Sequence, residues 1–148
     1  MELTNLIIPT ATARPGMSVE EVFRECVRVD VPGIPFQEKD GTITGKASIR
    51  YVLKETFIPD FMVKHAHLLG DEIRHLDIKE NQLSEILSLD IDSFVLEKMA
   101  VVNSSTPIAK ALATMEGLDT TYLFVIDDGV YKGIVSTMAI ARTMLTQA

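Results

Sequence analysis

Two serines stand where the sequence could bind a phosphate. Ser48 and Ser136 each follow a glycine, Gly45 or Gly133, by three positions, between an apolar segment and a helical pattern. A hydroxyl at a helix N-terminus can donate to a phosphate, which the free N–H groups of the first turn also attract. The same hydroxyl can instead cap the helix by accepting a hydrogen bond from one of those N–H groups. The sequence leaves both interpretations open.

The residues near Ser48 also allow more than one use. Arg50 can contact a phosphate or lie solvated on the surface. Tyr51 can stack on a ligand, fill the space that a ligand would need, or serve only in packing. Upstream, the segment Gly33-Ile34-Pro35 can let a ligand approach the backbone, because glycine has no side chain, or can simply begin a strand.

Other reactive side chains do not form a site in the sequence. Cys26 lies on the apolar face of a predicted helix, and we expect a buried structural thiol there. His65 and His67, two positions apart, would face different sides of a helix, whereas Asp71 and His75 could share one. No full set of metal ligands with a recognised spacing appears, nor any common nucleophile, phosphate-loop or dinucleotide motif. We therefore predict neither a metal site nor an enzyme.

Composition and charge narrow the class of protein further. The 148 residues carry a formal net charge of −7, which argues against a nucleic-acid or anionic-membrane surface but allows a local basic pocket. The single cysteine excludes an intrachain disulfide and fits a reducing compartment. No basic start leads into an apolar run, and no stretch approaches the roughly 18 apolar residues of a membrane helix. We expect a cytoplasmic protein without membrane insertion.

An internal repeat organises the chain. Asp40-Gly41 recurs as Asp128-Gly129, and the two Gly-x-x-Ser segments share the same separation of 88 residues. Upstream, the separation becomes 89, and the matched positions are Val19, Val22, Phe23 and Cys26 with Ile108, Ala111, Leu112 and Met115. We place the one-residue difference between Cys26 and Pro35, in a helix-to-strand connection where a change of length is tolerated.

Each copy predicts the order strand, helix, strand, strand, helix. Ser18 followed by Glu21 indicates a capping box at the first helix, whereas Thr106 is the predicted N-cap of its counterpart, with Pro107 as first helical residue. An Asp-Gly turn closes each hairpin. The predicted strands are 6–8, 34–37 and 42–47 in the first copy, and 99–102, 122–126 and 130–135 in the second. The strand 122–126 is apolar on both faces, which indicates a central position in its sheet.

The expected architecture is an α+β fold of two pseudo-twofold-related β-α-β-β-α units, packed sheet against sheet. We assign 1–57 to the first unit, 58–92 to a helical connecting insert and 93–148 to the second unit. The insert is apolar and amphipathic, with Gly70 as a plausible helix stop, and predicts two or three short helices. It either pads the core of the protein or forms a face for dimerisation or for a partner.

The ordered set of motifs resembles a tandem cystathionine-β-synthase-type (CBS) domain pair, or Bateman module, over roughly residues 4–57 and 93–147. The segments that carry the resemblance are 18–22, 33–36, 40–41 and 45–48 in the first half, and 106–108, 123–129 and 133–136 in the second. The resemblance implies clefts between the two sheets that often bind adenine nucleotides or adenosyl compounds. It also implies a homodimer formed through helices, and control of a partner protein whose identity the sequence does not give.

A ligand site follows from the resemblance, with one departure. The candidate contacts are Gly33, Ile34, Pro35, Ser48, Arg50, Tyr51, Tyr122 and Ser136, and the candidate ligands are AMP, ADP, ATP and S-adenosylmethionine. The family's ribose-phosphate signature ends in an aspartate three residues after the Ser or Thr. That position holds Tyr51 in the first copy and Ala139 in the second. A regulatory ligand-sensing module and a ligand-free structural or dimerisation module with degenerate clefts are therefore both carried forward.

Overall fold

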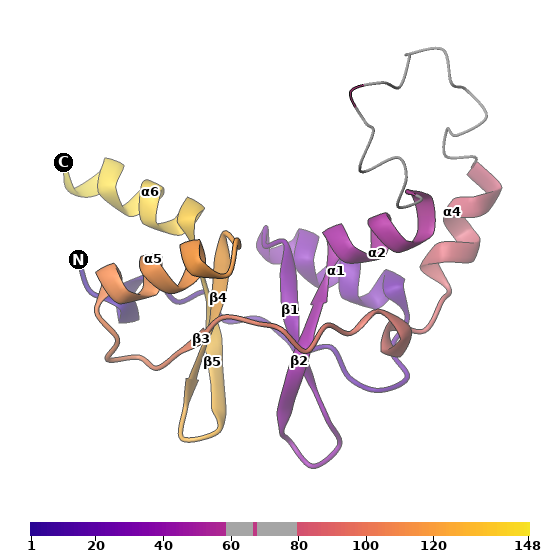
Figure 1. The fold of residues 1–148 in the computed structure, drawn as a ribbon, viewed down its shortest axis with the longest axis horizontal. Helices are drawn as coiled ribbons and strands as arrows, with labels where there is room; N and C mark the ends of the chain where they lie inside the picture. Colours follow the sequence, from indigo (N-terminus) through magenta and orange to yellow (C-terminus); the bar gives the residue numbers. More distant parts are fainter. Residues whose placement is uncertain (59–66, 68–79) are drawn as a thin grey trace.

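Two similar units lie side by side in the computed structural model, which describes residues 1–58, 67 and 80–148 (Figure 1). The first unit contains α1 (Val19–Val29), β1 (Gly33–Gln37), β2 (Ile43–Ser48) and α2 (Ile49–Phe57). The second contains β3 (Val101–Val102), α5 (Ile108–Gly117), β4 (Tyr122–Asp127), β5 (Val130–Ser136) and α6 (Thr137–Gln147). In each unit the helices lie at one end of the strands and the hairpin tip projects from the other (Figure 1). The predicted α+β class is confirmed.

The helix starts follow from local sequence in three of four cases. Ser18 caps α1 by accepting a hydrogen bond from Glu21 N at 3.2 Å, as the capping signature predicts. Ser48 and Ser136 cap α2 and α6 in the same way. The prediction for α5 is wrong by one residue, because Pro107 has a non-helical ψ of 144° and itself occupies the N-cap position. Thr106 instead accepts from Asn103 N at 3.2 Å within the preceding turn.

The two hairpins differ in length by one residue. β1 and β2 are joined by a three-residue turn, 39–41, closed by a hydrogen bond from Glu38 N to Thr42 O at 2.8 Å. β4 and β5 are joined by the two-residue turn 128–129, in which both residues have positive φ, as a type I′ turn requires. The predicted placement of this difference between residues 26 and 35 is therefore wrong. Residues before the turns correspond at a separation of 89, and residues after them at 88.

Each unit is completed by a segment from the other. Ile8 N donates to Ile134 O at 2.8 Å and Ile134 N donates back to Ile8 O at 2.9 Å. Lys46 and Leu96 exchange the equivalent bonds, at 2.8 Å from Lys46 N and 3.0 Å from Leu96 N. The two pairs are related by the repeat itself, so the units share their sheets reciprocally.

The predicted leading strand of the first unit, residues 6–8, is wrong. Leu3–Leu6 forms the 3-10 helix η1, and Leu3 and Leu6 are buried in the core of the second unit. Ile8 pairs with β5, and the following Pro9 has no N–H with which to continue a ladder. The true counterpart of β3 in the first unit is a single parallel bridge between Ala13 and Phe36.

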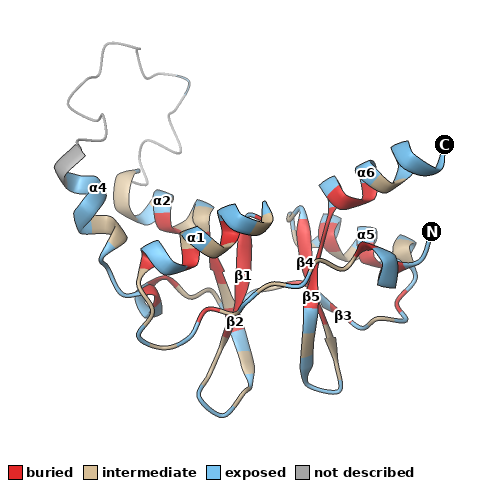
Figure 2. Ribbon diagram, turned by 180° about the vertical axis from the view of Figure 1, so that it is seen from behind, coloured by how far each residue is buried: buried red, intermediate tan, exposed pale blue. Residues whose placement is uncertain are grey.

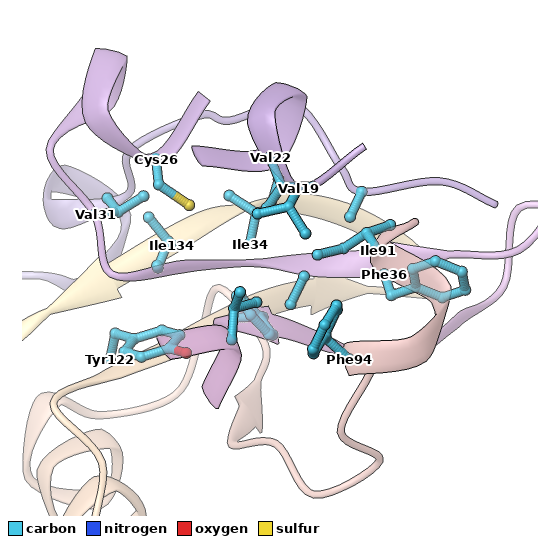
Figure 3. Close-up of a cluster of buried hydrophobic side chains, with 14 residues drawn as sticks. Val19, Val22, Cys26, Val31, Ile34, Phe36, Ile91, Phe94, Tyr122 and Ile134 are labelled. Carbon is cyan, nitrogen blue, oxygen red and sulfur yellow. The ribbon is translucent and has the colours of Figure 1, made fainter. Parts of the chain in front are cut away.

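Successive side chains of β4 belong alternately to the two hydrophobic cores. β4 lies between β3 and β5, as its apolar sequence predicts. Leu123 and Val125 pack with α5 and α6, whereas Tyr122 and Phe124 belong to the cluster that includes the residues of the first unit. Figure 3 shows Val19, Val22 and Cys26 of α1 on one side of β1 and Tyr122 on the other side. Burial is concentrated in the strand halves nearest the helices, and the hairpin tips are exposed (Figure 2).

The connection between the units includes α4 (Glu80–Leu87) and the 3-10 helix η4 (Ile91–Phe94). Ile86 and Leu87 pack against the core of the first unit, which favours the padding interpretation for this helix. The predictions about His65, His75 and the apolar residues between 59 and 79 lie outside the described residues. Within this stretch the structure describes only residue 67, a histidine. The boundaries 1–57, 58–92 and 93–148 stay a prediction.

Candidate ligand-binding site

A pocket of about 450 Å³ lies between the two units. One wall comes from β2 and α2 and consists of Lys46, Ser48, Arg50, Tyr51 and Lys54. The opposite wall comes from the end of α5 and the start of β4 and consists of Glu116, Asp119, Thr120, Thr121 and Tyr122. Pro32 and Leu96 complete the lining. Because each unit supplies one wall, the pocket exists only where the two units meet.

The N-terminus of α2 is held at the edge of this pocket. Ser48 Oγ accepts from Tyr51 N at 3.0 Å, and Ile49 N donates to Pro32 O at 3.0 Å. These bonds fix the first turn of the helix, whose positive dipole end favours an anion. The capping interpretation of Ser48 is therefore confirmed, and the hydroxyl can still donate its proton to a ligand.

Lys46 and Arg50 give the pocket a local positive charge in an acidic protein. Neither side chain forms an ion pair with any residue that the structure describes. Burial lowers the pKa of the Lys46 ammonium, and the positive charges of Arg50 and Lys98 lower it further. An anion between these groups would relieve both the repulsion and the loss of hydration.

Tyr122 forms the most unusual part of the pocket. Its side chain is only 7% exposed, and its hydroxyl is buried without a hydrogen-bond partner among the described residues. Lys46 Nζ lies 5.2 Å from the centre of its ring, within the range of a cation–π interaction. Burial raises the pKa of the Tyr122 hydroxyl to about 12, so the group is a neutral donor at physiological pH.

Gly33 makes room for Tyr122. A Cβ atom on Gly33 would lie 2.5 Å from Tyr122 Oη, closer than any real contact. The sequence suggested that a ligand could approach the backbone at Gly33. In the structure, a side chain from the other unit takes that space.

The opposite wall of the pocket presents carboxylate and hydroxyl oxygens. Asp119 adopts the left-handed conformation, with φ of 50°, at the turn that follows α5. Thr120 and Thr121 follow it, and Thr121 O accepts from Thr137 N at 2.9 Å. Carboxylate and hydroxyl oxygens in this position can accept hydrogen bonds from sugar hydroxyls.

The structure brings together four of the eight predicted contacts. Ser48, Arg50, Tyr51 and Tyr122 line the pocket. The other four do not line it: Gly33 lies against Tyr122, Ile34 and Pro35 are fully buried in β1, and Ser136 is buried as the N-cap of α6.

Sequence reasoning missed Lys46 and Asp119. Lys46 lies two residues before Ser48 on β2, so strand alternation alone would have placed both on one face. Asp119 lies at the position equivalent to Asp30, just before the predicted segment 33–35, so the repeat could have nominated it. The second signal needed the correct register between the units.

No group of three or more His, Cys, Asp or Glu side chains among the described residues is placed to hold a metal ion. No helix in this part of the chain is long and apolar enough to span a membrane.

Comparison with known proteins identifies the architecture. Residues 90–146 match the sequence profile of the CBS domain. No curated protein matches the chain. Among solved structures, a CBS domain-containing protein of unknown function from Bacillus anthracis covers 100% of this chain and 95% of its own, with a TM-score of 0.65 and 17% identity.

Two further structures contain ligands. CBSX2 in complex with AMP has 21% identity and a TM-score of 0.65, and the match covers 99% of this chain and 97% of CBSX2. The CBS domain pair of MJ0100, in complex with 5′-methylthioadenosine and S-adenosyl-L-methionine, has 13% identity and a TM-score of 0.67, with 100% and 98% coverage. The chain described here therefore carries a CBS domain at residues 90–146 and has, over its whole length, the fold of the CBS-domain-pair proteins.

Proposed function

We propose that this chain is a regulatory module that senses a small adenosyl or phosphate-bearing ligand in the pocket between its units and acts on a partner protein. The observation that carries the proposal is the pair Lys46 and Arg50, which line the pocket at the start of α2 without an anionic partner among the described residues. A phosphate placed there would receive charge-assisted hydrogen bonds from both side chains. In this proposal the chain is a cytoplasmic binding protein rather than an enzyme.

The ligand-bound neighbours support an adenosyl compound, and the local sequence modifies how it would bind. AMP, S-adenosylmethionine and methylthioadenosine are bound by proteins of the same fold. At the position of the family's ribose carboxylate this chain has Tyr51, which lines the pocket. Asp119, on the opposite wall, is the carboxylate that could accept from the ribose instead.

Thermal unfolding of the full chain with AMP, ADP, ATP or S-adenosylmethionine tests this proposal. A ligand that binds only the folded state at one hundred times its Kd adds about 2.7 kcal/mol to the free energy of unfolding. We expect at least one of the four to raise Tm, with NaCl of equal ionic strength as the control. If none raises Tm at millimolar concentration, the ligand-sensing proposal fails.

A ligand-free structural or dimerisation module is the second candidate. Exposed apolar side chains along α6 favour it: Met138 and Met144 are each 58% exposed and Leu145 is 81% exposed. A homodimer that packs α6 against its copy would cover them. Light scattering of the purified chain would give twice the monomer mass if this surface pairs, and the monomer mass would contradict it.

A further inference from the structure

The repeat allows the two sides of the inter-unit junction to be compared position by position. Residues 46, 50 and 54 on one side correspond to residues 134, 138 and 142 on the other, through the matched strand pairs Gly33–Ser48 and Tyr122–Ser136. If both sides bound the same kind of ligand, the groups that face it would be chemically similar. They are not similar at these three positions.

Two of the three cations are lost on the second side. Ile134 replaces Lys46 and is fully buried in the core, and Met138 replaces Arg50. The third position keeps a positive charge in Arg142, but its guanidinium already binds Asp30 Oδ2 at 3.0 Å. Asp30 is the equivalent of Asp119, so this ion pair joins the two walls of the second cleft directly.

The central tyrosine is also one-sided. Tyr122 and Gly33 occupy equivalent positions at the starts of β4 and β1, and the side chain of Tyr122 lies over Gly33. Tyr122 lines the pocket with Lys46 and Arg50, while its hydroxyl is buried against Gly33 without a partner among the described residues. The second cleft has no equivalent aromatic ring, because Gly33 stands at that position.

We propose that the chain has a single anion site, in which Lys46 and Arg50 hold a phosphate group beside Tyr122. In the equivalent cleft, the remaining cation Arg142 is engaged by Asp30 in an ion pair whose side chains are 57% and 80% exposed. This inference rests on the proposed ligand-sensing function and adds the stoichiometry and the groups that select for negative charge.

Calorimetric titration of the full chain with ATP tests the stoichiometry and the residues together. We expect one ATP per chain. Lys46→Met should weaken binding at least about tenfold, because one charge-assisted contact is lost. Arg142→Met is the matched control, since it removes one positive charge from the equivalent cleft, and it should leave the Kd unchanged.

Tyr122→Phe keeps the ring and removes the hydroxyl. It should leave the Kd for ATP unchanged, because the buried hydroxyl does not reach the pocket surface, and the variant should still unfold in one cooperative transition. Two equal sites per chain, or a Kd that responds to Arg142→Met and not to Lys46→Met, would overturn the single-site proposal while leaving ligand sensing in place. Absence of binding by ATP, and by the other three compounds, would remove the proposed function itself.

Discussion

At the scale of single residues, Tyr122 carries a cost that packing alone does not require. A phenylalanine would fill nearly the same volume against Gly33 without burying an unpaired hydroxyl. Leaving a buried hydroxyl unsatisfied costs about 1–3 kcal/mol. The packing of the unliganded protein therefore gives the hydroxyl no stabilising role.

Tyr122→Phe should raise the free energy of unfolding of the unliganded chain by about 1 kcal/mol, because the unpaired group is removed. Urea unfolding at pH 7, with Tyr51→Phe as the control at a partly exposed tyrosine of the same pocket, measures the difference. A variant that is less stable than the parent would indicate that the hydroxyl is hydrogen-bonded in the absence of ligand.

Glu25 is a second residue whose environment has a measurable consequence. Its carboxylate accepts from Arg28 at 2.7 and 2.9 Å and from Ala11 N at 2.5 Å. The hydrogen bond from Arg28, and then that from Ala11, holds the pKa of the Glu25 carboxyl below its usual 4.5. The folded state thus favours the ionised form, which ties the leading segment of the first unit to α1.

Glu25 should therefore contribute stability that is complete above about pH 4.5 and is lost as the pH falls through the lower pKa of the folded state. Glu25→Gln should remove this part of the acid sensitivity, so the gap between parent and variant narrows from pH 7 to pH 3. Urea unfolding at pH 7, 5 and 3 measures it. A gap that stays constant with pH would contradict the assignment.

At the scale of elements, two glycines allow a segment of each unit to lie against a strand of the other unit. At Gly45, a Cβ atom would lie 2.5 Å from Leu96 O and 2.8 Å from Val95 Cγ1. Gly133 is equivalent, and a Cβ there would lie 2.6 Å from Ile8 O. Because the obstructing atoms include backbone, the crossing strands cannot move aside without losing their hydrogen bonds. The glycine of each Gly-x-x-Ser segment is thus explained by strand exchange rather than by a ligand.

Gly45→Ala should destabilise the protein by more than about 2 kcal/mol, since the Cβ atom collides with the paired backbone of Leu96. Gly117→Ala is the matched control, because the end of α5 has open space around that glycine and a negative φ. It should leave stability unchanged or raise it slightly. Equal effects of the two substitutions in thermal unfolding would show that the backbone of Leu96 leaves room for a Cβ atom at residue 45.

At the scale of the whole molecule, the second unit depends on residues from the start of the chain. Leu3 and Leu6 are each 3% exposed within its core, and Ile8 pairs with β5. A fragment of residues 80–148 would expose this core and an unpaired strand edge. We therefore expect that residues 90–146, which match the family profile, do not fold independently.

The fragment 80–148 should lack a cooperative unfolding transition and should bind a hydrophobic dye, both measurable by circular dichroism and fluorescence. The full chain, tested in parallel, should unfold cooperatively. A fragment that unfolds in a single sharp transition would show that η1 and Ile8 are dispensable.

The sequence predicted the repeat because its signals are local: apolar periodicity at Val19, Val22 and Cys26, caps at Ser18 and Ser48, and Asp-Gly turns. It misplaced residues 6–8, because an apolar triplet does not show which of two similar sheets it joins. Four of its eight predicted contacts line the pocket: Ser48, Arg50 and Tyr51, which are close in sequence, and Tyr122 from the other unit. Strand alternation could have placed Lys46 beside Ser48, whereas Asp119 joins them only because the two units pack together.

That exchange also sets the order in which the molecule can form on the ribosome. When the first hairpin has left the exit tunnel, the edge of β2 still lacks Leu96, and Ile8 must wait until β5 has been made. Domains commonly fold one after another from the N-terminus, but here the first unit cannot close before Leu96 has been made, nor the second before β5 pairs with Ile8. Until then, open strand edges invite wrong pairing, including pairing with nascent copies of the same chain.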